Sequence, residues 1–133
     1  MKILFLCSSN IFRSQIAEAF FNKYSKNHIA ESAALDMPQD KMHNLVVNAM
    51  AEKNIDISKN QSKKATLNML LQADIIVLMS KNLQPKLNIG KETEIWDIPD
   101  IIADENDETA YQEFANARDI IESKVKEFIQ KIE

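Results

Sequence analysis

The sequence predicts an α/β fold: a three-layer, doubly wound domain in which a four-stranded parallel sheet carries helices on both faces. Two observations support this prediction. Residues 3–7 and 75–79 are continuously apolar, which is typical of strands covered on both faces. Stretches with apolar residues at helical spacing alternate with such runs, as in folds built from right-handed strand–helix–strand crossovers. We expect one domain over residues 1–133.

The first half of the chain is expected to contain two strands and two helices. Residues 3–7 form the first strand, and the spacing of apolar residues between Ile16 and Tyr24 predicts a helix of about three turns. Residues 28–34 form a second strand. A loop over residues 36–41 contains a proline and leads into a second helix. Its apolar face consists of Met42, Leu45, Val46, Ala49 and Met50, and His43 lies off this face, so we expect a solvated histidine.

The second half continues the alternation. Residues 54–64 are polar, and we expect an irregular, solvated segment there; its lysines are Lys59, Lys63 and Lys64. A short helix over 67–71 precedes the third strand at 74–79. Another short helix is expected to begin at Ser80 and to end before Pro85. Thr93 begins a short edge strand that ends at residue 97. The last helix runs from near Thr109 to the end, with a buried face of Phe114, Ala117, Ile121, Val125, Phe128 and Ile132.

Composition excludes several classes of function. Hydrophobic residues make up 45% and charged residues 27% of the chain, which is ordinary for a globular protein in water. A net charge of -4 predicts no nucleic-acid partner. The apolar run at residues 3–7 is too short for a signal sequence or a membrane span, so no membrane partner is expected. A single cysteine excludes an internal disulfide and fits a reducing cytoplasm.

One motif joins the first strand to the first helix. It reads Cys7, Ser8, Ser9, Asn10, Ile11, Phe12, Arg13, Ser14. A strand that turns through a short polar loop into a helix directs loop amides and the positive helix end toward one point, where anions bind. A thiol opens this loop and a guanidinium stands six residues later, in a chain with fourteen lysines but only two arginines. This is the pattern of a phosphatase whose cysteine attacks phosphorus.

The spacing has a chemical reason. The thiolate is the nucleophilic form of cysteine, and loop amides, a helix N-terminus and a nearby cation all favour it. Arg13 offers two parallel donors to two equatorial oxygens of a phosphoryl group. Ser14 is placed to donate a hydrogen bond to the thiolate or to cap the helix. The alternative is that Cys7 is a small buried hydrophobic residue and Arg13 lies at the surface.

The loop contains no glycine, because the only glycine in the chain is Gly90. Anion-binding loops often need a residue with positive φ. Asn10 is the best candidate, since asparagine tolerates the left-handed region better than most residues. Its side chain can then hold the loop through local hydrogen bonds.

The motif resembles the active-site loop of the low-molecular-weight protein tyrosine phosphatase family, which also includes arsenate reductases of the same fold. The likeness continues in order at residues 14–19, 31–34, 54–58 and 73–79. It implies that Cys7 and Arg13 are catalytic and that no metal or other cofactor is needed. It also implies substrate binding by the rest of the loop: Ser8, Ser9, Asn10, Ile11, Phe12 and Ser14.

The same resemblance implies two further site residues. The family has a serine at the position of Ser32 that supports the loop asparagine, although Ser32 is equally compatible with a plain polar strand residue. The family also supplies a proton donor from an Asp-Pro pair after the fourth strand. Asp100 stands at the matching place, with Ile101 where proline is expected, and Asp97 is the competing candidate. We favour Asp100 because the last helix begins at about the family's distance beyond it. The alternative is that both aspartates are solvated loop residues.

This chain also departs from the family pattern. Ser9 stands where glycine is usual, and Phe12 replaces a second loop cysteine found in many members. Ile101 and Ile102 occupy positions that are often aromatic, so the pocket need not prefer phosphotyrosine.

Three interpretations of function follow. The favoured one is a hydrolase that acts on a phosphorylated protein or a small phosphomonoester through a phosphocysteine. The second is an arsenate reductase that uses a small external thiol, because thioredoxin-coupled members need additional cysteines. The third is a non-catalytic module that binds oxyanions, suggested by the missing glycine and the altered Asp-Pro pair.

Overall fold

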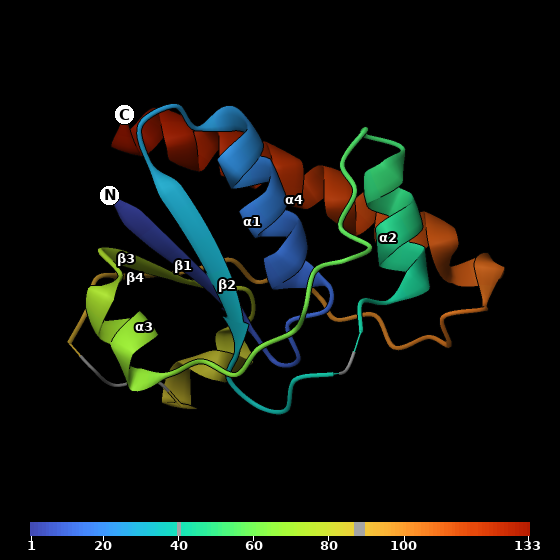
Figure 1. Cartoon of the computed structure of the whole chain (residues 1–133), viewed down its shortest axis with the longest axis horizontal. Coiled ribbons are helices and arrows are strands. Elements are labelled where there is room, and N and C mark those ends of the chain that lie inside the picture. Colours follow the sequence, from blue (N-terminus) through green and yellow to red (C-terminus); the bar gives the residue numbers. More distant parts are fainter. Residues whose placement is uncertain (40, 87–89) are drawn as a thin grey trace.

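A computed structural model describes residues 1–39, 41–86 and 90–133 of the chain (Figure 1). Residue 40, which belongs to the predicted loop at 36–41, lies outside this description. Strands and helices alternate as predicted. In chain order the elements are β1 (Lys2–Cys7), α1 (Arg13–Tyr24), β2 (Ile29–Ala34), α2 (Asn44–Ala51), α3 (Leu67–Gln72), β3 (Ile75–Leu78), η1 (Lys81–Lys86), β4 (Thr93–Ile95), η2 (Glu108–Ala110) and α4 (Tyr111–Ile132).

The described strands form a four-stranded parallel sheet in the order β2-β1-β3-β4. β1 pairs with β2 from Lys2 opposite Ile29 to Cys7 opposite Ala34, and on its other side it pairs with β3. The chain therefore changes direction across the sheet between β1 and β3. Open parallel sheets bind ligands at such a point, beyond the carboxyl ends of the strands. Cys7, the last residue of β1, lies at that point.

The pleat of β1 divides the core into two clusters. Ile3, Phe5 and Cys7 face the larger cluster, which α1, α2 and α4 cover, whereas Leu4 and Leu6 face a smaller one beneath α3 and η1. In Figure 1, α1 and α4 lie on one side of the strands and α3 lies on the other. The predicted three-layer arrangement is confirmed. Among the described residues, no helix combines the length and the apolar character that a membrane span requires.

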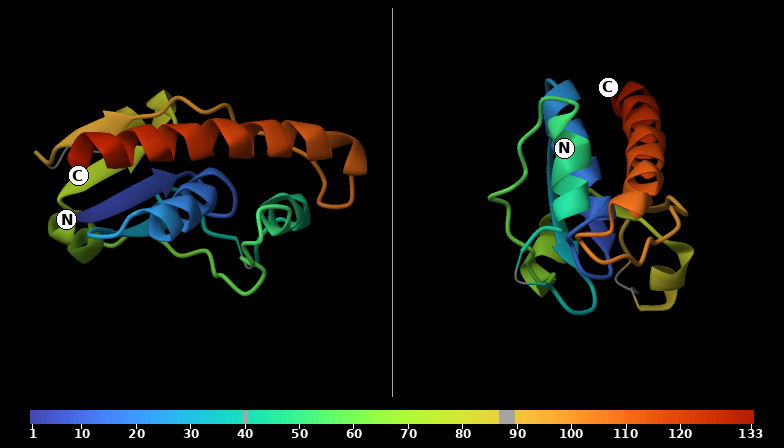
Figure 2. Two further views of the ribbon diagram at one scale, coloured as in Figure 1. Left: turned by 90° about the horizontal axis from the view of Figure 1, so that it is seen from above. Right: turned by 90° about the vertical axis from the view of Figure 1, so that its right-hand side faces the viewer.

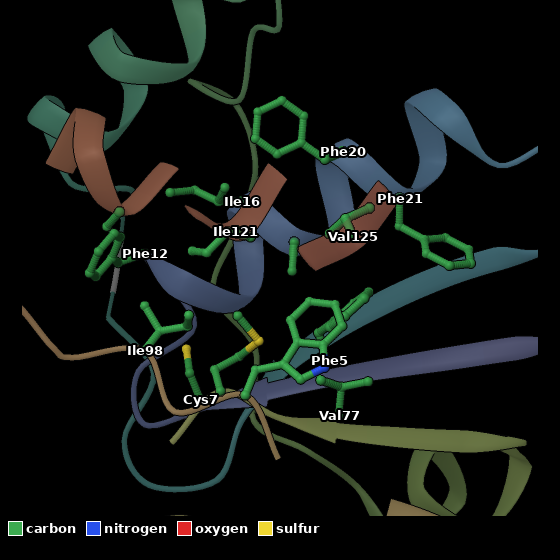
Figure 3. Close-up of a cluster of buried hydrophobic side chains, with 14 of the residues drawn as sticks. Phe5, Cys7, Phe12, Ile16, Phe20, Phe21, Val77, Ile98, Ile121 and Val125 are labelled. Carbon is green, nitrogen blue, oxygen red and sulfur yellow. The ribbon is translucent and has the colours of Figure 1, made fainter. Parts of the chain in front are cut away.

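Aromatic side chains fill the larger cluster (Figure 3). The ring of Phe5 on β1 lies 6.0 Å from Phe21 on α1 and 5.4 Å from Trp96, centroid to centroid. Trp96 in turn contacts Phe128 on α4 at 5.6 Å. These contacts fix α1 and α4 against the sheet, and α4 extends along most of the molecule (Figure 2). The predicted buried face of α4 is present, with Ile132 half-buried at its end.

Arg118, the second arginine, fastens α2 to α4. Its side chain is buried, and Nη1 donates a 2.8 Å hydrogen bond to the carbonyl oxygen of Ala49 in the last turn of α2. A cation at that place also complements the negative end of the helix dipole. α2 is therefore held firmly at its C-terminus.

Two short elements end at other residues than predicted. The edge strand expected to end at residue 97 is β4, which ends at Ile95. The short helix expected to end before Pro85 is the 3₁₀ helix η1, which continues to Lys86. Proline's fixed φ, near −65°, is compatible with 3₁₀ geometry, so the residue does not terminate this kind of helix.

Candidate active site

A pocket of about 250 Å³ lies beyond the carboxyl end of β1. The whole loop from Cys7 to Arg13 lines it. The remaining lining residues are Gln39, His43, Asp100, Ile101, Ile102, Ala103 and Phe114. The fold thus brings Cys7, Arg13 and Asp100, which are far apart in sequence, to one concave site.

Cys7 is 3% exposed, and part of its side chain packs in the larger hydrophobic cluster (Figure 3). Its sulfur nevertheless has a polar partner, because Cys7 Sγ lies 2.9 Å from Ser14 Oγ. Asn10 Nδ2 donates to the same Ser14 oxygen at 2.8 Å. Since the Ser14 oxygen already accepts a hydrogen bond from Asn10, the single hydroxyl proton of Ser14 can point at the sulfur. This arrangement directs a hydroxyl donor at the sulfur.

The chain of hydrogen bonds continues behind the loop. Asn10 Nδ2 also donates to Ser32 Oγ at 2.9 Å, so the contact expected between these two residues is present. Ser32 Oγ donates to Glu18 Oε1 at 2.9 Å. Donation therefore runs outward from the Asn10 amide in two directions, through Ser32 to Glu18 and through Ser14 to the sulfur. Ser14 and Ser32 lie behind the pocket rather than in its wall.

Glu18 is a site residue that the sequence analysis missed. In the sequence, the only indication of this role is that Glu18 stands four residues after Ser14, which puts both side chains on one face of α1. Burial raises the pKa of the Glu18 carboxyl, although the hydrogen bond from Ser32 and the charge of Lys63 act in the opposite direction.

The raised pKa of Glu18 predicts how the free energy of unfolding depends on pH. Above pH 4.5, the ordinary pKa of a glutamate, the unfolded chain releases the Glu18 proton before the folded chain does. The contribution of Glu18 to folding is thus fully present below pH 4.5 and is lost as the pH rises through the folded pKa. Glu18→Gln does not titrate and keeps an oxygen for Ser32. We expect the free energy of unfolding of wild type, relative to Glu18→Gln, to fall from pH 4.5 toward neutrality in urea titrations. A rising difference would contradict the assignment.

Asn10 has φ 57°, which confirms the predicted left-handed residue in the loop. Its side chain and carbonyl oxygen fix this conformation. Asn10 Oδ1 accepts from the backbone N–H of Lys63 at 3.1 Å and from Gln15 Nε2 at 3.2 Å, and Gln15 also donates to the Asn10 carbonyl. Because several partners hold Asn10, the loop keeps its shape without a glycine.

The segment before α3 therefore has a larger role than predicted. Ser62 Oγ donates a 2.6 Å hydrogen bond to the carbonyl oxygen of Ser9, beside the bond from Lys63 to Asn10. Residues 60–63 brace the loop from outside rather than forming a purely solvated segment. The side chains of Lys59 and Lys63 are exposed, whereas Lys64 Nζ binds the carbonyl oxygen of Leu35.

Arg13 is buried, with 5% of its side chain exposed. Nη1 donates to the carbonyl oxygen of Ile98 at 2.9 Å, and Nη2 lies 3.8 Å from Asp100 Oδ2. The Asp100 side chain is 53% exposed and lines the pocket. Asp97 instead lies beside Lys81, with Oδ2 3.9 Å from Nζ, and lines a neighbouring hollow that does not include Cys7.

His43 is not the solvated residue that the sequence predicted. It is half-buried, its ring centroid lies 4.9 Å from that of Phe114, and it lines the pocket. Nδ1 accepts from the backbone N–H of Leu45 and caps α2, while Nε2 lies 2.9 Å from the carbonyl oxygen of Ala103. The prediction failed because it placed His43 within the helix, on the side away from the apolar face. His43 is instead the residue that precedes the helix and caps it.

In the part of the chain that the structure describes, no group of three or more His, Cys, Asp or Glu residues is arranged to hold a metal ion.

Known proteins resemble this chain over its whole length. An arsenate reductase from Halalkalibacterium halodurans is 30% identical over 132 residues, which cover 96% of this chain and 94% of that protein. Among solved structures, Vibrio vulnificus Wzb in complex with benzylphosphonate has a TM-score of 0.85 at 23% identity and covers 98% of this chain and 97% of its own. The YwlE arginine phosphatase from Geobacillus stearothermophilus has a TM-score of 0.81 at 20% identity, with coverage of 98% and 92%. At these identities the two solved structures show the shared fold.

The family comparison is decisive. The sequence model described as low molecular weight phosphotyrosine protein phosphatase matches residues 2–133. The chain therefore belongs to the low molecular weight phosphotyrosine protein phosphatase family.

Proposed function

We propose that this protein is a cysteine-dependent phosphomonoester hydrolase, similar to protein tyrosine phosphatases, that works through a phosphocysteine intermediate. The observation that carries the proposal is the common pocket of Cys7, Arg13 and Asp100, with the Ser14 hydroxyl 2.9 Å from the sulfur. A nucleophile, a cation for equatorial oxygens and a proton donor are the groups that phosphoryl transfer to sulfur requires.

In the first half-reaction, the loop amides and Arg13 bind the phosphoryl oxygens. The Cys7 sulfur attacks phosphorus, and a sulfur–phosphorus bond forms as the phosphorus–oxygen ester bond breaks. Asp100 gives its proton to the departing oxygen, which leaves as an alcohol. In the second half-reaction, the Asp100 carboxylate takes a proton from water while that water attacks phosphorus. Inorganic phosphate leaves, and the Cys7 thiolate is restored.

The pocket geometry favours Asp100 over Asp97 as the acid. Asp100 lines the pocket that contains Cys7, and its carboxylate lies 3.8 Å from Arg13 Nη2, so a substrate held by Arg13 would lie close to it. Asp97 Oδ1 instead accepts the backbone N–H of Lys81, in the adjacent hollow.

The residues around the pocket opening indicate which leaving groups it can accept. Ile11, Ile101 and Ile102 surround the opening, with Phe12 and Phe114 deeper in the pocket. Ile102 is 96% exposed. An aliphatic rim of this kind accepts an apolar leaving group without the stacking that an aromatic wall offers to a phenol. We therefore propose phosphorylated proteins and small phosphomonoesters as the substrate class, without a strict preference for phosphotyrosine.

The test is release of phosphate from para-nitrophenyl phosphate, followed by a panel of phosphotyrosine, phosphoserine and small phosphorylated metabolites. We expect turnover that vanadate inhibits competitively and that needs no added metal. Binding of phosphate without turnover of any ester would contradict the proposal and would favour the oxyanion-binding module.

Arsenate reduction is the second candidate, supported by relatives about 30% identical that are named arsenate reductase. Arsenate has the shape of phosphate, so it would form an adduct with Cys7 in the same loop. Cys7 is the only cysteine in the chain. Two small external thiols would therefore supply the two electrons and leave as a disulfide, with arsenite as the reduced product. Arsenite release measured with different thiols, beside phosphate release from esters, distinguishes the two candidates.

A further inference from the structure

We propose that His43 is a positioning residue that holds the segment carrying Asp100 over the pocket. The proposal rests on the hydrolase proposed above. Residues 98–103 follow β4 and have no regular secondary structure. They cross the mouth of the pocket and lead toward α4. Something other than a helix or strand must therefore fix Asp100 within reach of a leaving group.

Side chains from other elements form hydrogen bonds with the backbone of this segment on either side of Asp100, and the backbone N–H of Ile98 also donates to the Met79 carbonyl oxygen at 3.1 Å. Before the aspartate, Arg13 Nη1 donates to the carbonyl oxygen of Ile98 at 2.9 Å. After it, His43 Nε2 lies 2.9 Å from the carbonyl oxygen of Ala103. Between these two points the side chains of Asp100 and Ile102 are largely exposed. Because Ile98 is also buried and bonded to Met79, we expect loss of the anchor at Ala103 to free the acid more than loss of the anchor at Ile98.

The His43 ring can donate at Ala103 because of its other contact. Nδ1 accepts a 3.2 Å hydrogen bond from the backbone N–H of Leu45, so in the neutral ring the proton lies on Nε2. Ala103 contributes a carbonyl oxygen, which can only accept. One side chain thus caps α2 and anchors the acid segment at the same time.

His43 is itself well supported. Its ring lies 4.9 Å from Phe114, and Phe114 lies 5.0 Å from Phe12 in the anion loop, centroid to centroid. At the other end of α2, Arg118 binds the carbonyl oxygen of Ala49. The histidine therefore connects the acid segment to α2, α4 and the loop. Lys41 makes a further link to Glu105 at 3.3 Å, but it is mostly exposed, and exposed ion pairs contribute little.

Two substitutions separate the two roles of His43. In His43→Asn, the side-chain oxygen occupies about the place of Nδ1 and remains one of the best helix caps, but it is too short to reach Ala103. In His43→Gln, the longer amide can reach toward Ala103, but the cap is weaker. Lys41→Gln is the matched control, because it removes the exposed contact between the same two segments.

A misplaced acid has a specific kinetic signature. Proton donation matters most when the leaving oxygen is strongly basic. We expect His43→Asn to lower kcat/KM for phenyl phosphate about tenfold more than it lowers kcat/KM for 2,4-dinitrophenyl phosphate. A general acid accelerates a reaction roughly 10²- to 10⁴-fold, so this difference corresponds to a partial loss of acid catalysis. His43→Gln should recover part of this difference, and Lys41→Gln should resemble wild type. Affinity for inorganic phosphate should stay within about twofold, since the anion loop is unchanged.

A measurement independent of turnover completes the test. In His43→Asn we expect faster hydrogen exchange at the amides of residues 101–107, with exchange in β1 and α1 unchanged. Equal losses for both esters in His43→Asn, with exchange unchanged, would overturn the proposal and leave His43 as a helix cap alone. Absence of ester hydrolysis by the wild type would instead refute the proposed function, while the exchange experiment would still report on the anchor.

Discussion

Replacement of Cys7 by serine is expected to abolish turnover of phosphate esters while the pocket stays folded. A serine hydroxyl is protonated at neutral pH and is a poor nucleophile without a base beside it. The neighbour of Cys7 Sγ is the hydroxyl of Ser14, at 2.9 Å, which stabilises an anion but does not readily take a proton. We expect kcat to fall by roughly 10⁶-fold, the scale on which loss of the nucleophile acts in covalent catalysis. Phosphate release and the phosphorylated Cys7 peptide of rapidly denatured wild type are the measurements.

The control for this variant is retention of the anion site. Serine is nearly isosteric with cysteine, and the loop is held by Asn10, Gln15 and Ser62 rather than by the sulfur. Titration with inorganic phosphate and the near-ultraviolet signal of Trp96 should therefore resemble those of wild type. Turnover that survives in Cys7→Ser on the same substrates would refute the mechanism.

The second large effect is expected from Asp100→Asn. An asparagine keeps the size of the side chain but cannot give a proton to the leaving oxygen or take one from water. We expect kcat to fall about 10²- to 10⁴-fold, with a larger loss of kcat/KM for esters of weakly acidic alcohols. Rates for a series of aryl phosphates, plotted against the acidity of the phenol, measure this dependence.

Asp97→Asn is the matched control, because the same chemical change is made three residues earlier. Asp97 lies beside Lys81, in a hollow that does not include Cys7, and we expect its variant to retain nearly all activity. A reversed result, with the larger loss in Asp97→Asn, would transfer the acid role to that residue. Equal, small losses in both variants would exclude a catalytic carboxylate on this segment.

The sequence was sufficient for the fold because each signal was local. The apolar run that ends at Cys7 and the branched residues of β3 identify buried strands directly. The positive φ of Asn10 could also be predicted, since a glycine-free loop leaves few residues that tolerate that conformation. Pro85 misled the prediction, because the rule applied to it describes α-helices and the element is a 3₁₀ helix.

The supporting residues of the site could not be found in the same way. Glu18 is connected to the sulfur through Ser32 on β2 and then through Asn10 and Ser14. Residues 62 and 63 contact the loop from a segment that resembles ordinary polar coil. His43 contacts a carbonyl oxygen sixty residues later in the chain. Such contacts depend on how the elements pack, and a hydrogen bond to a backbone carbonyl leaves no mark on the identity of the residue that accepts it.

The bracing of the anion loop has a consequence for how the protein loses activity. Partners from β2, from residues 60–63 and from the segment after β4 all contact this one loop. A fragment that lacks one of these partners loses a hydrogen bond that holds the loop, so we expect the shape of the anion loop to depend on contacts from distant parts of the chain. Partial opening at either edge of the sheet would disable the enzyme before the core unfolds, and inactivation would precede global denaturation.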